Sequence, residues 1–232
     1  MNIVVLTGAG VSAESGISTF RDSNGLWENH RVEDVATPEG FARDPELVYR
    51  FYNQRRAQLL SDKIQPNAAH HALARLEQAC SGNFTLVTQN VDDLHERAGS
   101  QNVLHMHGEL LSAKCAQSEE AIRMHTPFDA NSRCACCQPP NILRPDIVWF
   151  GEIPYHMDKI EAALIHCDLF ISIGTSGKVY PAAGFVAFAK ECGAKTVEIN
   201  LEASERYSDF DLAIHGMASE KVPQYVDSLL QR

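Results

Sequence analysis

The stretch Ile3-Val4-Val5-Leu6-Thr7-Gly8-Ala9-Gly10-Val11-Ser12-Ala13 decides the fold, because a short apolar, β-branched run leads directly into a glycine loop. The loop fits G-x-G-x-x-A after a strand, which is the context of the dinucleotide-binding fingerprint. Glycines let the backbone approach a pyrophosphate, and the free N–H groups at a following helix start can bind it. A tight strand-to-helix turn without a ligand is the alternative interpretation. The stretch favours a nucleotide-binding loop on an α/β domain.

Strands and helices alternate through the rest of the chain. Further strand-like apolar runs occupy 85–88, 169–173 and 196–200, with weaker candidates at 103–105, 147–149 and 212–214. Helical patterns separate them at 46–60, 68–79, 157–166, 182–192 and 219–230. Continuous rather than alternating apolar runs suit a parallel sheet that is covered on both faces. The expected fold class is therefore α/β, with a Rossmann-like doubly wound parallel sheet.

Two stretches, 31–66 and 112–144, do not fit this alternation. The first places a helix and loops between the first two strands, and the second is polar, cysteine-bearing and rich in proline. At 232 residues the chain has the length of one large domain. We expect a single domain, 1–232, with a large Rossmann-like lobe of residues 1–30, 67–111 and 145–232. The two inserts would form a small second lobe, a helical module at 31–66 and a zinc-ribbon-like insert at 112–144.

Composition and charge argue against several classes of protein. Hydrophobic residues make up 44% and charged residues 22%, which are ordinary globular values. The 30 acidic and 20 basic residues give a formal net charge of -10, which argues against nucleic-acid binding through bulk charge. No apolar run reaches the roughly 18 residues that a membrane span needs. The start of the chain leaves no room for a signal peptide, so we expect no membrane partner and a cytoplasmic location.

The usual dehydrogenase continuation is missing after the glycine loop. Residues 14–21 are rich in Ser and Gly, and no strand precedes Glu33 and Asp34, which stand about 20 residues further on. A nicotinamide-dependent oxidoreductase built on the same loop is therefore a disfavoured alternative. We expect the dinucleotide to lie differently, with the loop of residues 14–27 covering it.

Five motifs, in order along essentially the whole chain, resemble the signature of the sirtuin family. They are Gly8-Ala9-Gly10-x-Ser12-x-x-Ser15-Gly16-Ile17-x-x-Phe20-Arg21, Thr88-Gln89-Asn90-Val91-Asp92, His105-Met106-His107-Gly108, Gly174-Thr175-Ser176 and Asn200-Leu201-Glu202. Five ordered motifs are far more specific than any one of them. The resemblance implies an NAD-dependent protein-lysine deacylase. It would act on acetyl-lysine and on succinyl- or malonyl-lysine, and release nicotinamide and O-acyl-ADP-ribose.

The resemblance also implies the roles of individual residues. His107 would be the catalytic base, because a histidine with a pKa near 6.5 can accept a proton from a ribose hydroxyl at neutral pH. Its neighbour His105 would be a strand residue with a packing role. NAD would be bound by residues of the motif loops together with Trp27 and Ala218. The full set is Gly8, Ala9, Gly10, Ser12, Ala13, Gly16, Phe20, Arg21, Trp27, Gln89, Asn90, Asp92, Gly174, Thr175, Ser176, Asn200, Leu201, Glu202 and Ala218.

The helix expected at 46–60 carries a charge inside an apolar face. At 100° per residue, Arg55 lies in the middle of the face formed by Val48, Phe51, Tyr52 and Leu59. A guanidinium there needs an anion, unless it extends to solvent or pairs with a carboxylate of the protein itself. In the family that the chain resembles, Tyr-x-x-Arg at this place marks the members that remove acidic acyl groups.

The same resemblance implies how an acylated lysine on a protein substrate would be bound. Arg55 would bind the distal carboxylate of a succinyl or malonyl group, and Tyr52 would add a hydroxyl. Ala36 matches the small residue expected at the mouth of the acyl pocket. The segment Val148-Trp149-Phe150-Gly151 resembles the strand that pairs with the substrate peptide, and Val148, Phe150 and Gly151 are its expected substrate contacts.

Four of the seven cysteines lie between positions 115 and 137, inside the second insert. The family that the chain resembles holds a structural zinc with two C-x-x-C pairs, but Ser118 stands where one of these cysteines is expected. Zinc prefers four tetrahedral ligands, so Cys136 or His125 would be the fourth ligand beside three cysteines that keep the family's spacing. The three ligands that keep the spacing are Cys115, Cys134 and Cys137.

Two alternatives stay open. For the cysteine cluster, the alternative is a metal-free remnant held by loop packing. For the whole chain, a second alternative is a nucleotide-sensing zinc-ribbon interaction module in place of an enzyme. The acidic charge and the incomplete cysteine set count against the second. The remaining cysteines are expected to be inert core thiols: Cys80, Cys167 and Cys192.

Overall fold

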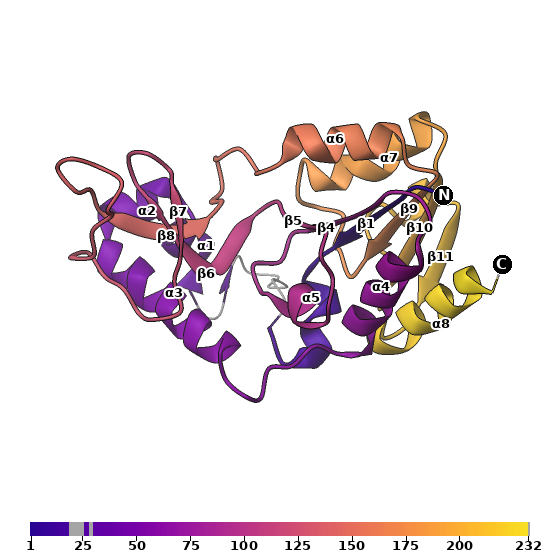
Figure 1. The fold of residues 1–232 in the computed structure, drawn as a ribbon, viewed down its shortest axis with the longest axis horizontal. Coiled ribbons are helices and arrows are strands. Elements are labelled where there is room, and N and C mark those ends of the chain that lie inside the picture. Colours follow the sequence, from indigo (N-terminus) through magenta and orange to yellow (C-terminus); the bar gives the residue numbers. More distant parts are fainter. Residues whose placement is uncertain (19–25, 28–29, 232) are drawn as a thin grey trace.

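The computed structural model describes residues 1–18, 26–27 and 30–231. Its centre is a six-stranded parallel sheet in the order β11-β10-β9-β1-β4-β5 (Figure 1). The chain moves outward from β1 in both directions, so the loops after β1 and β9 flank the point where the strand order reverses. The predicted α/β class is confirmed. The strands are β1 (Ile3–Thr7), β4 (Phe84–Thr88), β5 (Val103–His105), β9 (Leu169–Ile173), β10 (Lys195–Asn200) and β11 (Leu212–His215).

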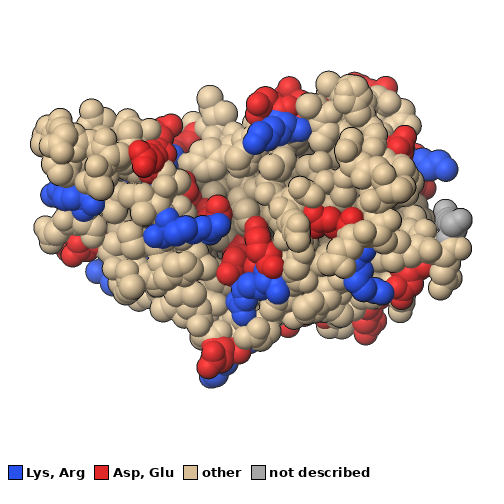
Figure 2. Space-filling view, in the orientation of Figure 1, with Lys and Arg blue, Asp and Glu red and all other residues tan. Residues whose placement is uncertain are grey.

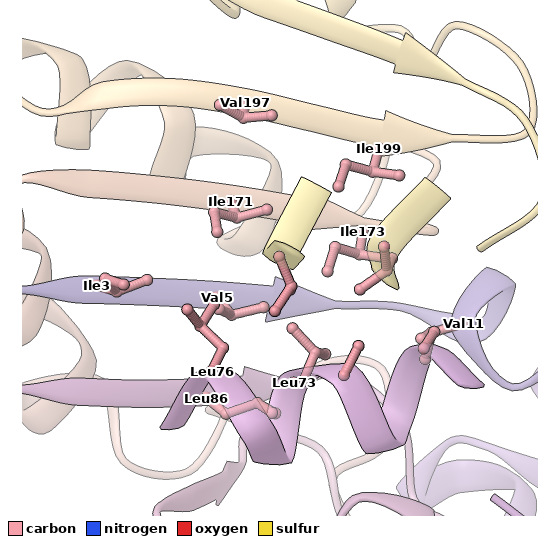
Figure 3. Packing of buried hydrophobic residues seen from close by; sticks show 14 of the residues in the cluster. Ile3, Val5, Val11, Leu73, Leu76, Leu86, Ile171, Ile173, Val197 and Ile199 are labelled. Carbon is pink, nitrogen blue, oxygen red and sulfur yellow. The ribbon is translucent and has the colours of Figure 1, made fainter. Parts of the chain in front are cut away.

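One face of this sheet is covered by α4 (Ala68–Ala79) and α8 (Ala218–Leu230), which pack against each other. Leu76 of α4 belongs to the same buried cluster as Val5 and Ile171, which pair in register across β1 and β9 (Figure 3). Every residue of β1 and β9 is buried, because helices cover both faces of the sheet. This is why the two strands read as continuous apolar runs in the sequence.

The opposite face is covered by α6 (Met157–Ile165) and α7 (Phe185–Glu191). The helix expected at 182–192 divides into a short 3-10 turn, η3 (Ala182–Gly184), and α7. Cys192 ends α7 as an exposed residue and Cys80 is half-buried, so the prediction of core thiols is right only for Cys167. Cys80 and Cys192 directly follow α4 and α7, and Cys80 still packs against the edge of the core cluster beneath α4.

A small second lobe adjoins the carboxyl ends of the parallel strands (Figure 1). It contains helices and a three-stranded antiparallel sheet in the order β7-β6-β8. A two-stranded ribbon pairs β2 with β3, and a short helix, α5, follows β4. The helix α5 (Leu94–Arg97) packs against α4. The other elements are β2 (Leu26–Trp27), β3 (His30–Arg31), α1 (Val32–Val35), α2 (Pro38–Arg43), α3 (Pro45–Leu59), β6 (Gly108–Cys115), β7 (Ala121–Arg123) and β8 (Leu143–Ile147). Besides η3, the described residues form the short 3-10 turns η1 (Ala9–Val11), η2 (Ala13–Ser15) and η4 (Tyr207–Asp209).

The weak strand prediction at 147–149 is wrong in position. The strand β8 begins at Leu143 and ends at Ile147, so Trp149 lies beyond it. Its limits are set by pairing with β6, in which Cys115 opposes Leu143. The prediction followed the apolar residues after Ile147. An antiparallel strand also needs hydrogen-bond partners, and those of β8 lie in β6, a strand that the apolar pattern did not predict.

Helix α3 is buried on two sides. Asp44 caps its start by accepting a hydrogen bond from the backbone N–H of Leu47 at 3.0 Å. Phe51 faces one hydrophobic cluster and Tyr49 another. The most deeply buried arginine of the helix is Arg56, with 2% of its surface exposed. Its Nε atom donates to the carbonyl oxygen of Leu110 at 2.9 Å, so this buried charge has a structural partner.

No helix in the described part of the chain is long and apolar enough to cross a membrane. On the face shown in Figure 2, acidic and basic side chains are interspersed over a largely uncharged surface. This face therefore presents charges of both signs rather than one extended basic field.

Candidate active site

A cavity of about 640 Å³ opens where the parallel sheet meets the small lobe. The loops that follow β1, β4 and β9 form one part of its wall, and α3 together with the segment after β8 forms another. Ligands of parallel α/β sheets bind beyond the carboxyl ends of the strands, so the cavity lies where a nucleotide is expected. The predicted site residues that line it are Gly8, Ala9, Gly10, Ser12, Trp27, Tyr52, Arg55, Gln89, Asn90, Asp92, His107, Val148, Phe150, Gly151, Gly174, Thr175 and Ser176.

The glycine loop after β1 packs directly on the loop after β9. The N–H of Gly10 donates to the carbonyl oxygen of Gly174 at 2.9 Å. A Cβ atom on Gly10 would lie 2.7 Å from the Cα atom of Gly174, and Gly174 itself has a φ of +63°. Side chains at either position would force the two loops apart. The glycines are therefore needed for the approach of the two loops to each other.

Polar side chains form a buried hydrogen-bonded group at the inner end of the cavity. The hydroxyl of Ser12 donates to Oδ2 of Asp92 at 3.0 Å and accepts from Nδ2 of Asn90 at 3.1 Å. The second carboxylate oxygen of Asp92 accepts from the backbone N–H of Leu94 at 3.1 Å. Burial raises the pKa of Asp92 to about 6, against the lowering effect of these hydrogen bonds. The group fixes the amide and carboxylate that face the cavity.

Two buried histidines beneath this group were not predicted as site residues. His70 Nδ1 accepts the N–H of Asn67 in a capping box, which leaves Nε2 to donate toward Ser12, 3.4 Å away. His95 Nε2 lies 3.0 Å from the hydroxyl of Thr7. Burial lowers the pKa of His70 to about 4, so His70 is neutral at pH 7. The spacing Asn-x-x-His at a helix start is a sequence signal that could have found His70.

His107 follows β5 and precedes Gly108, the first residue of β6. Its Nδ1 atom lies 3.1 Å from the carbonyl oxygen of Gln89. Burial lowers the pKa of His107, and the hydrogen bond to Gln89 only partly opposes this effect. A carbonyl can only accept, so Nδ1 carries the proton and Nε2 has a free lone pair. A neutral imidazole in this tautomer can accept a proton from a bound group.

The expected acyl-binding residues lie together on the small-lobe side of the cavity. The hydroxyl of Tyr52 accepts a hydrogen bond from Nε1 of Trp149 at 3.0 Å, and burial raises the pKa of Tyr52. The guanidinium of Arg55 lies 4.8 Å from the centre of the Phe51 ring. Ala36, which also lines the cavity, accepts the backbone N–H of Phe150 at 2.9 Å. The wall thus combines aromatic surface, one cation and one hydroxyl.

Several predicted nucleotide contacts lie away from the cavity wall or outside the described residues. Phe20 and Arg21 belong to the part of the chain that is not described. Asn200 donates through Nδ2 to the carbonyl oxygen of Thr175 at 2.7 Å, so it supports a loop that lines the cavity. The roles of these residues in nucleotide binding stay predictions. The described residues of the prediction that are not among the cavity-lining residues are Ala13, Gly16, Asn200, Leu201, Glu202 and Ala218.

The cysteine cluster has the geometry of a tetrahedral metal site. The sulfur atoms of its four cysteines all lie within 4.8 Å of one another. Zinc–sulfur bonds of about 2.3 Å in a tetrahedron place sulfurs about 3.8 Å apart. Two pairs match this spacing, Cys115 with Cys137 at 3.6 Å and Cys136 with Cys137 at 3.8 Å. The donor set therefore fits zinc, and its members are Cys115, Cys134, Cys136 and Cys137.

Cys136 supplies the fourth sulfur of the cluster, because Ser118 stands at the position where a cysteine was expected. The hydroxyl of Ser118 lies 3.1 Å from the Cys136 sulfur, so the serine lies beside the cluster. Of the two candidates for the fourth ligand, Cys136 belongs to the cluster and His125 does not. Cys115 ends β6, and the first and last of the eight residues of that strand lie roughly 23 Å apart at about 3.3 Å per residue. His107 adjoins the other end, so a metal here is remote from it.

A cavity at the carboxyl ends of the parallel strands, lined by two glycine loops and by a half-buried histidine that can accept a proton, has the features of an enzyme active site that binds a nucleotide. A family model described as "Sir2 family" matches residues 8–181. The chain therefore belongs to the Sir2 family, the sirtuins.

Similar proteins and structures agree with this assignment. The chain is 60% identical over 230 residues to an NAD-dependent protein deacylase of Pasteurella multocida (strain Pm70), covering 99% of this chain and 98% of that protein. It is 61% identical over 229 residues to an NAD-dependent protein deacylase of Vibrio parahaemolyticus (serotype O3:K6, strain RIMD 2210633), covering 99% and 95%. A crystal structure of a Sir2 homologue–NAD complex superimposes with a TM-score of 0.87 at 39% identity, covering 98% and 90%. A Sir2 bound to acetylated peptide gives 0.82 at 29%, covering 97% and 92%.

Proposed function

We propose that this chain is an NAD-dependent protein-lysine deacylase that releases nicotinamide and O-acyl-ADP-ribose. The placement of His107 carries the proposal. Its ring lines the same cavity as the glycine loops after β1 and β9, and the Gln89 carbonyl holds it in the tautomer of a base. The proteins that match it at about 60% identity are NAD-dependent protein deacylases, which supports this assignment.

In the proposed reaction, bound NAD would supply an electrophilic anomeric carbon for the acyl oxygen of the modified lysine, with nicotinamide as the leaving group. His107 then accepts a proton through Nε2 from a ribose hydroxyl, which becomes a better nucleophile toward the acyl carbon. The lysine amine would be released, and one water consumed, when the acyl group passes to the ribose. Asn90 and Asp92 hold the ribose and the carboxamide, because their side chains are fixed by Ser12 and face the cavity. The backbone of the glycine loop binds the pyrophosphate.

The acyl end of the substrate is bound on the small-lobe side. We assign the methyl of acetyl-lysine and the chain of succinyl- or malonyl-lysine to the space beside Tyr52 and Arg55. A cation and a hydroxyl in a largely apolar wall suit an acyl group that ends in a carboxylate. The substrate backbone would lie along the segment 148–151, in the manner of an added strand. Acetyl and acidic acyl groups are therefore both substrates.

The four cysteines of the small lobe hold a structural zinc in this proposal. Zinc there would join Cys115, at the end of β6, to the loop that carries Cys134, Cys136 and Cys137. It would take no part in the reaction. We further propose that the enzyme acts in the cytoplasm. None of the seven cysteines forms a disulfide in the structure, which suits a reducing compartment.

The test is an analysis of the products that NAD yields with matched peptides. Purified protein is incubated with NAD and peptides that differ only in carrying acetyl-, succinyl- or unmodified lysine, and products are identified by mass spectrometry. We expect free nicotinamide and O-acyl-ADP-ribose with both acylated peptides and neither product with the unmodified one. Formation of NADH would support the oxidoreductase alternative, and no acyl transfer would contradict the proposal.

A further inference from the structure

The indole of Trp149 is held rigidly beside the acyl end of the cavity. Only 2% of its surface is exposed, and the guanidinium of Arg144 lies 3.6 Å over its ring. Arg144 is fixed in turn by a two-point ion pair with Glu152, at 2.6 and 2.9 Å. Glu152 also accepts the backbone N–H of Trp149 at 2.8 Å. Arg144 and Glu152 therefore set the direction of the indole N–H.

That N–H determines what the hydroxyl of Tyr52 can do. Trp149 Nε1 donates to the Tyr52 oxygen at 3.0 Å, and an indole nitrogen can only donate. The hydroxyl proton of Tyr52 must consequently be offered to some other acceptor. A hydroxyl that accepts one hydrogen bond also becomes a stronger donor of its own. Tyr52 lines the cavity beside Arg55, so a bound acyl group is a natural acceptor.

We propose that Trp149 is a positioning residue for acyl selectivity, which orients the Tyr52 hydroxyl to donate to the carboxylate of an acidic acyl group. A carboxylate accepts hydrogen bonds and a methyl group does not, so the effect acts on succinyl- and malonyl-lysine and not on acetyl-lysine. This inference rests on the proposed function, because it assigns the acyl end of the substrate to the space beside Tyr52. It adds a residue that acts through Tyr52.

The test removes the N–H and keeps the aromatic packing. In Trp149→Phe, and in a variant with benzothienylalanine at 149 that replaces the N–H by sulfur, kcat/KM is measured for matched succinyl- and acetyl-peptides. We expect the succinyl-to-acetyl ratio to fall about 2- to 10-fold, the range of one neutral hydrogen bond. Most of the change should appear as a higher KM for the succinyl-peptide. Measurable deacetylation in each variant shows that it is folded.

Two further variants separate this inference from loss of packing. In a Tyr52→Phe background the same changes at 149 should leave the ratio unaltered, because no hydroxyl remains to be oriented. Tyr49→Phe is the matched control, since the Tyr49 hydroxyl of the same helix donates to the Leu143 carbonyl at 2.6 Å, and it should keep the wild-type ratio.

The outcomes also distinguish the inference from the proposed function. An equal fall in both activities on loss of the N–H would overturn the role of Trp149. So would an identical fall of the ratio whether or not Tyr52 keeps its hydroxyl. If Tyr52→Phe lowers the ratio but neither change at 149 does, the acyl site is supported and the inference about Trp149 fails. If wild-type protein does not act on the succinyl-peptide, the proposed function fails first.

Discussion

The Nδ1 atom of His107 lies 3.1 Å from the carbonyl oxygen of Gln89, a residue of the loop that follows β4. The contact links the candidate base to a residue of the nucleotide-binding wall, because Gln89 also lines the cavity. It also fixes which nitrogen carries the proton, since a carbonyl oxygen accepts and cannot donate. Hydrogen bonds that fix a tautomer in this way orient the imidazole for proton transfer.

Replacement of this histidine tests its role directly. His107→Ala should lower deacylation by about 10²- to 10⁴-fold, because a positioned proton acceptor is lost, while the melting temperature stays near that of the wild type. In the wild type, kcat/KM should fall as the pH drops through the lowered pKa of His107, where the base becomes protonated. The measurement is kcat/KM on an acetyl-peptide between pH 5 and 9.

The control for this change is His71→Ala, which removes an exposed histidine from α4. It should leave both the rate and its pH dependence unchanged. Near-wild-type turnover by folded His107→Ala protein would remove His107 from the mechanism.

A second histidine, His105, should make stability depend on pH. Its Nε2 atom lies 2.7 Å from Oε1 of Glu96 and its Nδ1 atom 3.3 Å from the carbonyl oxygen of Asn90. Burial opposes a charge here, but the hydrogen bond and charge of Glu96 outweigh burial and raise the pKa of His105. The pKa of a histidine in the unfolded protein is near 6.5, so protonation of His105 favours the folded state. This contribution to the free energy of unfolding is complete below pH 6.5 and is lost as the pH rises through the pKa of His105 in the folded protein.

Glu96→Gln should therefore destabilise the protein at pH 6 more than at pH 9. We expect about 1 kcal/mol at the lower pH, since Glu96 is partly exposed and solvent screens the pair. Free energies of unfolding from urea titrations at the two pH values give the difference. Glu161→Gln, an exposed change on α6, serves as the control. An identical loss of unfolding free energy at both pH values would show that protonation of His105 is not linked to folding.

The sequence predicted those parts of the fold in which local pattern and tertiary burial agree. The run 169–173 coincides with β9, because both faces of that strand are covered and every residue is apolar or small. Helix α3 shows where the argument fails. A single helical wheel placed Arg55 at the centre of the buried face, but Arg56 is the more deeply buried arginine. Clusters cover α3 on two sides, and Arg56 reaches a carbonyl of β6 between them.

The site was predicted unevenly for similar reasons. Motif loops that directly follow strands, such as 8–12 and 174–176, line the cavity because strand ends meet at one edge of the sheet. His70 was not assigned to the site, and Trp149 was named only as part of the segment 148–151, because the contacts of both side chains join segments far apart in the chain. Cys136 could be named only as one of two candidates, since ligand choice depends on how the loop folds over Cys115.

Arg56→Met tests the structural role of the buried arginine. The change leaves the carbonyl oxygen of Leu110 and the amide oxygen of Asn53 without their guanidinium donor. We expect a loss of about 1–3 kcal/mol in the free energy of unfolding, the cost of unpaired buried polar groups. Urea unfolding measures the loss. Acetyl and succinyl activities of the remaining folded protein should fall in equal proportion, and a selective loss of one would contradict a purely structural role.

Removal of zinc should destabilise the small lobe before it slows the reaction. A chelator, or Cys136→Ser, should lower the zinc content from one equivalent and lower the melting temperature, because metal binding is coupled to folding. Metal analysis and thermal unfolding measure the two effects. Cys192→Ser removes an exposed cysteine outside the cluster and should change neither. Protein purified with one equivalent of zinc after Cys136→Ser would exclude Cys136 as the fourth ligand.

The last prediction concerns Arg55, the residue that precedes Arg56 in α3. Arg55 lines the cavity on the side proposed for the acyl group. Arg55→Met keeps the apolar stem and deletes the charge. A charge-assisted hydrogen bond to a carboxylate contributes roughly 1.5–3 kcal/mol, and a desolvated carboxylate left without a partner costs more. The kcat/KM for a succinyl-peptide should therefore fall roughly 10- to 1000-fold, since each 1.4 kcal/mol is tenfold.

Deacetylation by the same variant should fall far less, because an acetyl group has no carboxylate to lose its partner. The measurement is kcat/KM for matched acetyl- and succinyl-peptides, with Arg56→Met as the neighbouring control that lowers both together. Tyr52→Phe should show the same asymmetry more weakly, because it removes one neutral hydrogen bond. An equal loss of both activities in Arg55→Met would make Arg55 a structural residue of α3, and acidic acyl groups would then need another cation.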